Sequence, residues 1–393
     1  MLTQASTTSW REEFKSMGAR KGFVVASVAI LGLLGTACGS SSGTTGASHS
    51  GAPYSAKFSW GNFTLSSAVA SKVDKKQALN FVLSFQTLAT VGAPVNLLAG
   101  MRQAAADVKS QYGVTVNVKL IGPATTDPVA QISQVQQAIA AGQVDCLAVE
   151  PVTPDAFVRV INQAIDGGIP AYTVNTDSPD SHRFAYNGAN DSFPPKGAYQ
   201  MGQVSGQYTI QWLKDHNVTP HVAALVTGDT TAPWAQGRMQ GWMDTMKQAL
   251  PDLQFVGTPT NALTTGYDPT DIYAKVAAFM NGHPNVDLYF DSDWGAKTIG
   301  KLIKDRGLKG KINTIGYNVD TTYLDEVTSG DVMATVDQRY DEQSFGFVKG
   351  CAAFLLKGTV PPDQYAYVQP TVVTPTNVAD VKARLAQEIA LGS

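Results

Sequence analysis

The chain has 393 residues, of which 44% are hydrophobic and 16% are charged, and its formal net charge at pH 7 is −3. A chain of this length and hydrophobic content supports substantial buried cores, and we expect two domains. The slightly acidic charge argues against nucleic-acid binding as the main task.

The N-terminal segment predicts a secretory signal. Arg20 and Lys21 form a basic start, and residues 23–34 form an apolar run that is too short to span a bilayer comfortably. Small residues then lead to Cys38. This order resembles a bacterial lipoprotein signal, although Leu34 lies four residues before the cysteine instead of the usual three.

The resemblance implies that Cys38 is acylated and becomes the new N-terminus, and plain secretion is the alternative. We expect residues 1–37 to be a signal peptide and residues 38–76 to be a lipid anchor and flexible tether. The first part of this tether is rich in glycine and serine, a composition typical of flexible linkers.

A regular alternation of strands and helices follows the tether. Apolar or alternating runs predict strands at residues 78–85, 114–121, 145–150, 169–175, 222–227, 253–257, 286–291, 312–317 and 332–336. Helix starts are predicted where a capping residue precedes a proline, at Asp127, Thr153 and Asp268. Strands separated by helices of this length predict an α/β fold with parallel sheets. We divide the two strand–helix series near residues 188–191.

Polar side chains gather just after the predicted strands. Ligands of parallel α/β sheets bind beyond the carboxyl ends of the strands, so these positions matter most for function. They carry amides, carboxylates and hydroxyls, with aromatic residues such as Trp234, Tyr267 and Trp294 alongside. Amides and carboxylates pair with vicinal hydroxyls, and aromatic faces pack on sugar rings. This pattern favours a neutral polyol site over a phosphate or peptide site.

Catalysis and metal binding find little support in the sequence. The five histidines are scattered, with no metal-binding spacing, and no nucleophile elbow or phosphate-binding loop follows a strand. We therefore expect no enzyme activity and no cofactor. Cys146 falls in a predicted strand and Cys351 in a predicted helix, and we expect two buried free thiols, with a disulfide as the alternative.

Residues 141–191 resemble the type I periplasmic sugar-binding proteins, the ribose-binding group of ABC importers. The resemblance rests on the strand entry at Asp145, the helix start at Pro154, the Gly-Ile-Pro segment at 168–170 and the Tyr-Asn-Gly segment at 186–188. Later segments match in order and spacing, over roughly residues 78–375.

The resemblance implies two Rossmann-like or flavodoxin-like lobes with parallel sheets, joined by a three-stranded hinge (periplasmic binding protein-like I). It places the N-terminal lobe in residues 77–189 plus 339–369 and the C-terminal lobe in residues 190–338 plus 370–393.

The same resemblance implies a set of ligand-binding residues. Matched position by position, with two tryptophans added for ring stacking, the expected set is Asn175, Asp177, Trp234, Arg238, Asp293, Trp294, Asn318 and Gln338. Each has a structural alternative: an exposed ion pair for Arg238, a helix cap for Asp293, turn chemistry for Asn175, Asp177 and Asn318, a hinge role for Gln338 and lobe packing for the tryptophans.

The ligand expected from this set is not ribose. Ribose binders usually carry Asp-Arg where this chain has Asn175 and Thr176, and Asp177 is expected to take over the acidic role. The double-aromatic clamp of the N-terminal lobe is replaced by residues 90–94, Thr-Val-Gly-Ala-Pro.

The expected function is that of an extracytoplasmic solute-binding lipoprotein. It would capture a sugar or polyol between two lobes and deliver it to ABC permease subunits, as a monomer held by its lipid anchor at the cell membrane or in the periplasm. The main alternative is a sensory binding protein that presents its ligand to a chemoreceptor or sensor kinase. A repressor of the lactose-repressor type would carry a DNA-binding segment where this chain has a leader, and an enzyme on the same scaffold would turn its ligand over.

Overall fold

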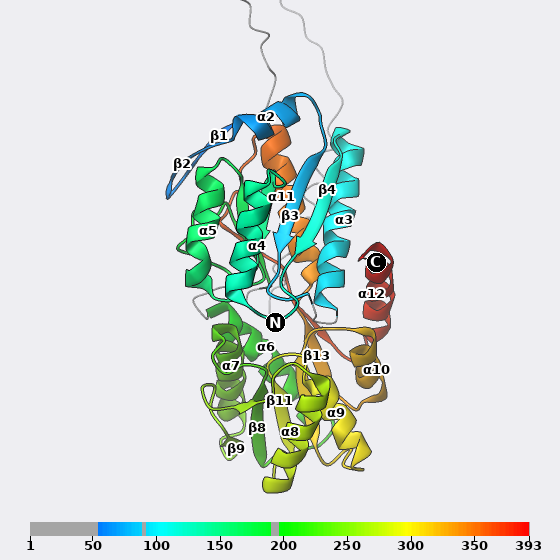
Figure 1. The fold of residues 1–393 in the computed structure, drawn as a ribbon. Coiled ribbons are helices and arrows are strands. Elements are labelled where there is room, and N and C mark those ends of the chain that lie inside the picture. The colour runs from blue at the N-terminus through cyan, green and yellow to red at the C-terminus, as the bar shows by residue number, and fades with distance from the viewer. Residues whose placement is uncertain (1–53, 89–91, 190–195, 393) are drawn as a thin grey trace, which may run out of the picture. The chain divides into compact units, whose positions relative to one another are not determined.

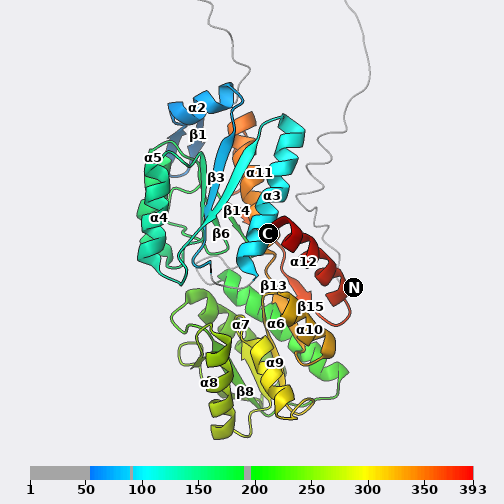
Figure 2. The ribbon, with the colours of Figure 1, turned by 45° about the vertical axis from the view of Figure 1, so that its right-hand side comes forward.

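A computed structural model describes residues 54–88, 92–189 and 196–392 of the chain. The expected signal peptide, Cys38 and the first part of the expected tether lie outside these residues. Figure 1 shows two parallel sheets, each flanked by helices, and Figure 2 shows the same fold turned by 45°.

The first sheet and its helices form the N-terminal lobe. Its strands run in the order β14-β7-β6-β5-β3-β4 and all pair in parallel. The strands are β3 (Leu79–Ser84), β4 (Val116–Ile121), β5 (Cys146–Val149), β6 (Ala171–Val174), β7 (Tyr186–Gly188) and β14 (Tyr365–Tyr367). The helices α3 (Ala93–Tyr112), α4 (Pro128–Ala140), α5 (Pro154–Asp166) and α11 (Tyr340–Lys357) contribute side chains to one core with this sheet. Because helices cover both faces, β5 and β6 are buried at every residue.

The second sheet belongs to the C-terminal lobe. Its strands run in the order β10-β8-β11-β12-β13-β15, with β9 also paired to β8, and β15 pairs antiparallel whereas the other described strands of this sheet pair in parallel. The strands are β8 (Val222–Thr227), β9 (Gln254–Val256), β10 (Leu263–Thr264), β11 (Leu288–Asp291), β12 (Asn313–Tyr317), β13 (Ala334–Asp337) and β15 (Thr371–Val373).

Helices cover both faces of this second sheet. Alternate residues of β8 enter two different cores: Ala223 and Leu225 pack with α6 (Lys196–Asp215) and α7 (Pro233–Ala249), whereas Ala224 and Val226 pack with α8 (Pro269–Gly282) and α9 (Ala296–Asp305). The remaining helices are α10 (Thr321–Ser329) and α12 (Val378–Gly392). Among the described helices, none is both long and apolar enough to cross a membrane.

The predicted α/β class and parallel sheets are confirmed, and each predicted strand overlaps an observed one. Asp127 and Asp268 cap α4 and α8 by accepting backbone N–H groups. Thr153 precedes α5 but makes no capping hydrogen bond with its side chain.

The chain passes between the sheets close to the carboxyl ends of their strands. β13 of the C-terminal lobe is followed within three residues by α11 of the N-terminal lobe. Further on, β14 pairs with β7 of the N-terminal lobe, and the next strand, β15, pairs with β13 of the C-terminal lobe. Another predicted crossing, near residues 188–191, falls partly on residues outside the described range. The final helix, α12, contacts both α3 and α10 (Figure 2).

Residues 55–74, which we expected to belong to the flexible tether, are folded. They form the hairpin of β1 (Ser55–Phe58) and β2 (Gly61–Thr64), followed by α2 (Ser67–Asp74). Phe63, Leu65 and Val69 are buried in the core of the N-terminal lobe. The apolar residues of this segment are too few and too irregularly spaced to predict a strand or helix from the sequence. The segment is stabilised instead by the burial of these side chains against the N-terminal lobe.

The expectation of two free thiols is wrong. Cys146 in β5 and Cys351 in α11 form a disulfide, with 6.2 Å between their Cα atoms. The two residues are 205 positions apart in sequence. The helix that carries Cys351, α11, follows strands β8 to β13 of the second sheet along the chain. Sequence alone does not show that α11 packs over β5, so the pairing was not predictable from the residues.

Candidate ligand-binding site

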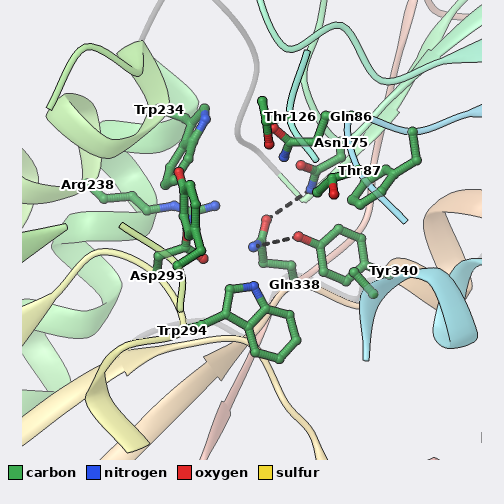
Figure 3. Close-up of a pocket in the computed structure, with 13 residues that line it drawn as sticks. Gln86, Thr87, Thr126, Asn175, Trp234, Arg238, Asp293, Trp294, Gln338 and Tyr340 are labelled. Carbon is green, nitrogen blue, oxygen red and sulfur yellow. Dashed lines mark hydrogen bonds between the residues drawn. The ribbon is translucent and has the colours of Figure 1, made fainter. Parts of the chain in front are cut away.

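A cavity of about 470 Å³, counting space open to solvent, lies at the carboxyl ends of strands from both sheets. Figure 3 shows its walls, which are formed by Phe85, Gln86, Thr87, Ala93, Thr126, Asn175, Trp234, Arg238, Tyr267, Asp293, Trp294, Gln338 and Tyr340.

The parallel topology explains why these residues meet. On the N-terminal side, Gln86 and Thr87 follow β3, and Asn175 follows β6. On the C-terminal side, Asp293 and Trp294 follow β11, while Trp234 and Arg238 lie on α7. The carboxyl ends of parallel strands lie at one edge of a sheet, and here the two edges contribute opposite walls of one cavity.

Six of the eight predicted ligand residues line this cavity: Asn175, Trp234, Arg238, Asp293, Trp294 and Gln338. Whether they contact a ligand stays a prediction. Asn318 is buried directly behind the wall, where its amide nitrogen donates to Asp293 at 2.8 Å.

Four of these polar side chains form a continuous hydrogen-bonded chain. The Asn175 amide donates to the Gln338 carbonyl oxygen at 3.0 Å, and the Gln338 amide donates to the Asn318 oxygen at 2.6 Å. Asn318 in turn donates to Asp293. The Gln338 amide also contacts the Tyr340 hydroxyl at 3.2 Å (Figure 3). Every amide in the chain donates toward the carboxylate, so its charge orients the series.

Asn175 and Asn318 share an unusual backbone conformation. Their φ angles are 63° and 73°, in the left-handed region that asparagine tolerates better than most residues. Each residue comes directly after a strand, β6 or β12, so the chain turns sharply at the point where the side chain enters the site. Both asparagines therefore serve the turn and the site together.

Arg238 is buried, which rules out the exposed ion pair considered from the sequence. Its side chain is 2% exposed, and its Nη1 atom donates to the Ser292 carbonyl oxygen at 2.9 Å. The guanidinium carbon lies 4.8 Å from the ring centre of Trp234 and 4.4 Å from that of Tyr317. Aromatic faces attract such a cation, so both rings help to fix the guanidinium at the cavity wall.

Trp294 packs between the lobes, and its ring stacking on a ligand stays a prediction. Its ring lines the cavity, and it also packs against the core of the N-terminal lobe. Gly92, at the start of α3, has a φ of 96°, and a Cβ atom there would lie 2.8 Å from the Trp294 ring. Gly92 therefore permits this close contact between the two lobes.

Asp177 is not among the residues that line the cavity. The structure places its carboxylate against the buried Arg183 as an ion pair, and it also accepts from the Thr173 hydroxyl at 2.6 Å. The reason is local: β6 ends at Val174, and the left-handed turn at Asn175 changes the direction of the chain before Asp177. This placement gives no support to the expected ligand role.

The set predicted from the sequence omitted seven cavity residues, namely Phe85, Gln86, Thr87, Ala93, Thr126, Tyr267 and Tyr340. Gln86 and Thr87 follow β3, so their position after a strand was the available signal. Thr126 precedes the capping residue of α4, and Tyr340 lies two residues beyond Gln338. Neither position carries a pattern that distinguishes it from an ordinary loop or helix start.

Each wall has a buried acid behind it. Burial raises the pKa of Glu150, at the end of β5, to about 8, although hydrogen bonds from Thr176 and the Gln86 backbone oppose this. Burial, and then the nearby charge of Asp293, raise the pKa of Asp291 to about 8. Within the described residues, no group of histidine, cysteine or acidic side chains is arranged to hold a metal ion.

Comparison with known proteins places this fold and cavity in a family. A family model for the periplasmic binding protein domain matches residues 95–357. The xylose/arabinose-binding protein XylF of Sulfolobus acidocaldarius is 23% identical over 255 residues, which cover 61% of this chain and 60% of that protein. The chain thus matches less than two thirds of the length of that curated relative.

Solved structures agree in fold. GanP, a glucose-galactose binding protein from Geobacillus stearothermophilus, superposes with a TM-score of 0.63 at 23% identity, covering 76% of this chain and 98% of that one. An ABC transporter solute-binding protein from Burkholderia graminis in complex with D-arabinose gives a TM-score of 0.64 at 20% identity, covering 76% and 96%. With the family model matched over most of the chain, this protein belongs to the periplasmic binding protein family.

Proposed function

We propose that this chain is an extracytoplasmic solute-binding protein that captures a neutral sugar or polyol between its two lobes and delivers it to the permease of an ABC importer. The observation that carries the proposal is the composition of the cavity wall. It combines amides, hydroxyls, one guanidinium and one carboxylate with two tryptophan rings. These groups suit vicinal hydroxyls and the apolar faces of a sugar ring.

The charge of the wall supports a neutral ligand. Arg238 and Asp293 are its cationic and anionic side chains among the lining residues, and their charges cancel. An anionic ligand such as a phosphate would face Asp293 without a surplus of cations to offset it. A sugar hydroxyl, in contrast, accepts from the guanidinium and donates to the carboxylate at once.

Capture would work through differential binding. A ligand that contacts Asn175 on one lobe and Arg238 and Asp293 on the other gains more contacts when the lobes close around it. The closed form then presents a surface that differs from the ligand-free form. A permease that binds the closed form preferentially would accept only loaded protein.

The names of the similar proteins support a sugar as the ligand. They mention xylose and arabinose, glucose and galactose, and D-arabinose. We propose a sugar or polyol other than ribose, because Asn175 and Thr176 replace the charged Asp-Arg pair of ribose binders and Asp177 is occupied by Arg183.

A thermal-shift screen of protein without residues 1–37 tests the function. The sugar panel comprises D-xylose, D-arabinose, D-ribose, D-glucose, D-galactose, D-allose, myo-inositol and glycerol. A sugar at 100 times its dissociation constant stabilises the folded state by about 2.7 kcal/mol, which raises Tm measurably. No shift with any member of the sugar panel contradicts the proposal, and tight binding of D-ribose alone contradicts the exclusion of ribose.

We further propose that Cys38 carries a lipid that anchors the protein at the outer face of the cytoplasmic membrane, because a basic, apolar and small-residue segment precedes it. Cys38→Ser should move the protein from the membrane fraction to the soluble extracytoplasmic fraction. Continued membrane association of the variant in detergent-free fractionation would show that the anchor lies elsewhere.

A further inference from the structure

Two buried carboxyl groups flank strand β5. Asp145 directly precedes the strand, and Glu150 directly follows it. Each pairs with the neighbouring chain of β3: the Asp145 N–H donates to the Asn80 carbonyl oxygen, and the Glu150 N–H donates to the Ser84 carbonyl oxygen, both at 2.8 Å. The two acids differ in location and in partner: Asp145 pairs with Lys72 at 2.8 Å, whereas only Glu150 lies at the end of the strand that faces the cavity.

The side chain of Glu150 connects two loops. Its Oε2 atom accepts the Gln86 backbone N–H, and its Oε1 atom accepts the Thr176 hydroxyl, each at 3.1 Å. β5 lies between β3 and β6 in the sheet, and Gln86 follows β3 whereas Thr176 follows β6. One carboxyl group therefore joins the loops on both sides of its own strand.

These two loops carry most of the N-terminal wall of the cavity. Gln86 and Thr87 belong to the first loop and Asn175 to the second, and all three line the cavity. Glu150 and Thr176 are buried and are not among the lining residues. The hydrogen bond between Glu150 and Thr176 can therefore affect the cavity wall only by changing the position of the loops.

The backbone of Glu150 is itself fixed from behind. The buried side chain of Gln131, on α4, donates to the Glu150 carbonyl oxygen at 2.8 Å and to the Ser84 hydroxyl at 3.2 Å. Glu150 is thus held by α4 and β3 while its carboxyl group reaches both loops. The arrangement forms a rigid support for the site.

We propose that Glu150 is a positioning residue for ligand capture, which fixes the spacing of the loops after β3 and β6 so that Gln86, Thr87 and Asn175 face the ligand together. The proposal rests on the proposed function. Burial raises the pKa of this carboxyl group to about 8, because the buried site disfavours its ionised form. Such a buried acid beside a cavity is typical of a functional site.

The test compares four variants by calorimetric titration with the member of the sugar panel that binds wild type most tightly. Glu150→Ala removes both acceptors and should raise Kd at least about tenfold, equivalent to about 1.4 kcal/mol. Glu150→Gln keeps the size and one acceptor and should lie between wild type and Glu150→Ala. Asp145→Ala and Asp145→Asn are matched controls at the far end of the same strand, and they should lower Tm while Kd stays within about twofold.

A double-mutant cycle separates positioning from general stability. Thr176→Val removes the hydroxyl that donates to Glu150 without changing a lining residue. If Glu150 acts through this loop, Thr176→Val should raise Kd in wild type but add little in the Glu150→Gln background. A purely structural role would lower Tm in both backgrounds and leave Kd coupling absent.

Each outcome bears on a separate claim. If wild type binds no member of the sugar panel, the proposed function fails, and this proposal fails with it. If wild type binds but Glu150→Gln and Thr176→Val retain its affinity, only the positioning role is overturned. An equal rise in Kd for the Asp145 and Glu150 variants would also overturn it, because the effect would then follow stability. Glu150→Gln keeps the test valid if Glu150→Ala does not fold.

Discussion

The two walls of the cavity differ in chemistry. The N-terminal lobe contributes only uncharged residues to this lining, namely Phe85, Gln86, Thr87, Ala93, Thr126, Asn175 and Tyr340. The C-terminal lobe contributes the charged pair Arg238 and Asp293 together with the rings of Trp234, Tyr267 and Trp294 (Figure 3). Hydrogen bonds to charged groups are stronger than those between neutral groups. We therefore expect the C-terminal wall to supply most of the affinity and the N-terminal wall to complete the site.

The two lobes also differ in how they are assembled. The N-terminal lobe combines an early segment with α11, which returns after the second sheet, and the Cys146–Cys351 disulfide joins the two parts. The C-terminal lobe has no disulfide among the described residues. The covalent link therefore joins the two parts of the N-terminal lobe, and neither cysteine lines the cavity.

Removing this disulfide should give the largest effect on stability. The double variant Cys146→Ala/Cys351→Ala should lose about 2–5 kcal/mol of unfolding free energy, because the unfolded chain is no longer constrained. The measurement is denaturant unfolding of both proteins, with reduced wild type as the control. Sugar affinity should stay near the wild-type value, since neither cysteine lines the cavity. Unchanged stability would show that the link does not hold the lobe together.

Substitutions in each wall test whether the C-terminal wall contributes more binding free energy than the N-terminal wall. Arg238→Ala should cost about 1.5–3 kcal/mol of binding free energy per hydrogen bond lost to the ligand, whereas Gln86→Ala should cost about 0.5–1.5 kcal/mol. Arg238→Lys should not restore affinity, because a lysine lacks the planar fork that stacks on Trp234 and Tyr317. Calorimetry on the three variants is the measurement. A greater loss for Gln86→Ala than for Arg238→Ala would reverse our assignment of the walls.

The C-terminal wall was the more predictable one from sequence. Arg238, Asp293 and Gln338 each lie at a position that a family motif marks, and each reaches the cavity as the motif implies. Asp293 and Gln338 follow short buried strands, β11 and β13, whose ends the sequence defines well. The parallel topology does the rest, because it brings those ends together.

The N-terminal wall was less predictable for physical reasons. Asp177 was expected to replace the acid that ribose binders carry at the Asn175 position, but after the left-handed turn at Asn175 its carboxylate pairs with Arg183. Thr126 and Tyr340 reach the cavity only because the tertiary fold brings a helix start and a crossing segment to it. The folded hairpin at residues 55–64 was missed because its stability comes from burial against the lobe.

Stability should fall as pH rises through neutrality. Glu150 behind one wall and Asp291 behind the other have pKa values raised to about 8, and burial together with Asp341 raises that of Glu388 to about 8. Between the ordinary carboxyl pKa and about 8, these groups hold protons in the folded chain that the unfolded chain has lost. Each group therefore lowers the unfolding free energy by up to about 1.4 kcal/mol per pH unit in that window.

Glu150 and Asp291, one behind each wall, should contribute equally to this dependence of the unfolding free energy on pH. Glu150→Gln and Asp291→Asn should each remove about the contribution of one group from the slope between pH 6 and pH 8, measured by denaturant unfolding. If neither variant reduces the change of unfolding free energy with pH, the two acids are ionised in the folded protein. That result would contradict the raised pKa values behind both walls.

The smallest expected effect belongs to Asn318, which lies behind the C-terminal wall. Asn318→Gly preserves the left-handed backbone and removes the amide that links Asp293 to Gln338. The loss of these two hydrogen bonds, which support the site only indirectly, should weaken sugar binding by about 1 kcal/mol, or roughly fivefold, in a fluorescence titration. A loss as great as that of Arg238→Ala would mean that Asn318 contacts the ligand directly.

The central claim is that a neutral sugar or polyol binds between the two walls and is held chiefly by the C-terminal one. Calorimetric titration of wild type and Asp293→Ala with the sugar panel tests it most directly, with unfolding curves to verify that both proteins are folded. We predict saturable binding of one sugar per chain by wild type, and a Kd at least about tenfold higher in Asp293→Ala, equivalent to about 1.4 kcal/mol. Equal affinity of the two proteins, or no binding of any sugar by wild type, would contradict this account.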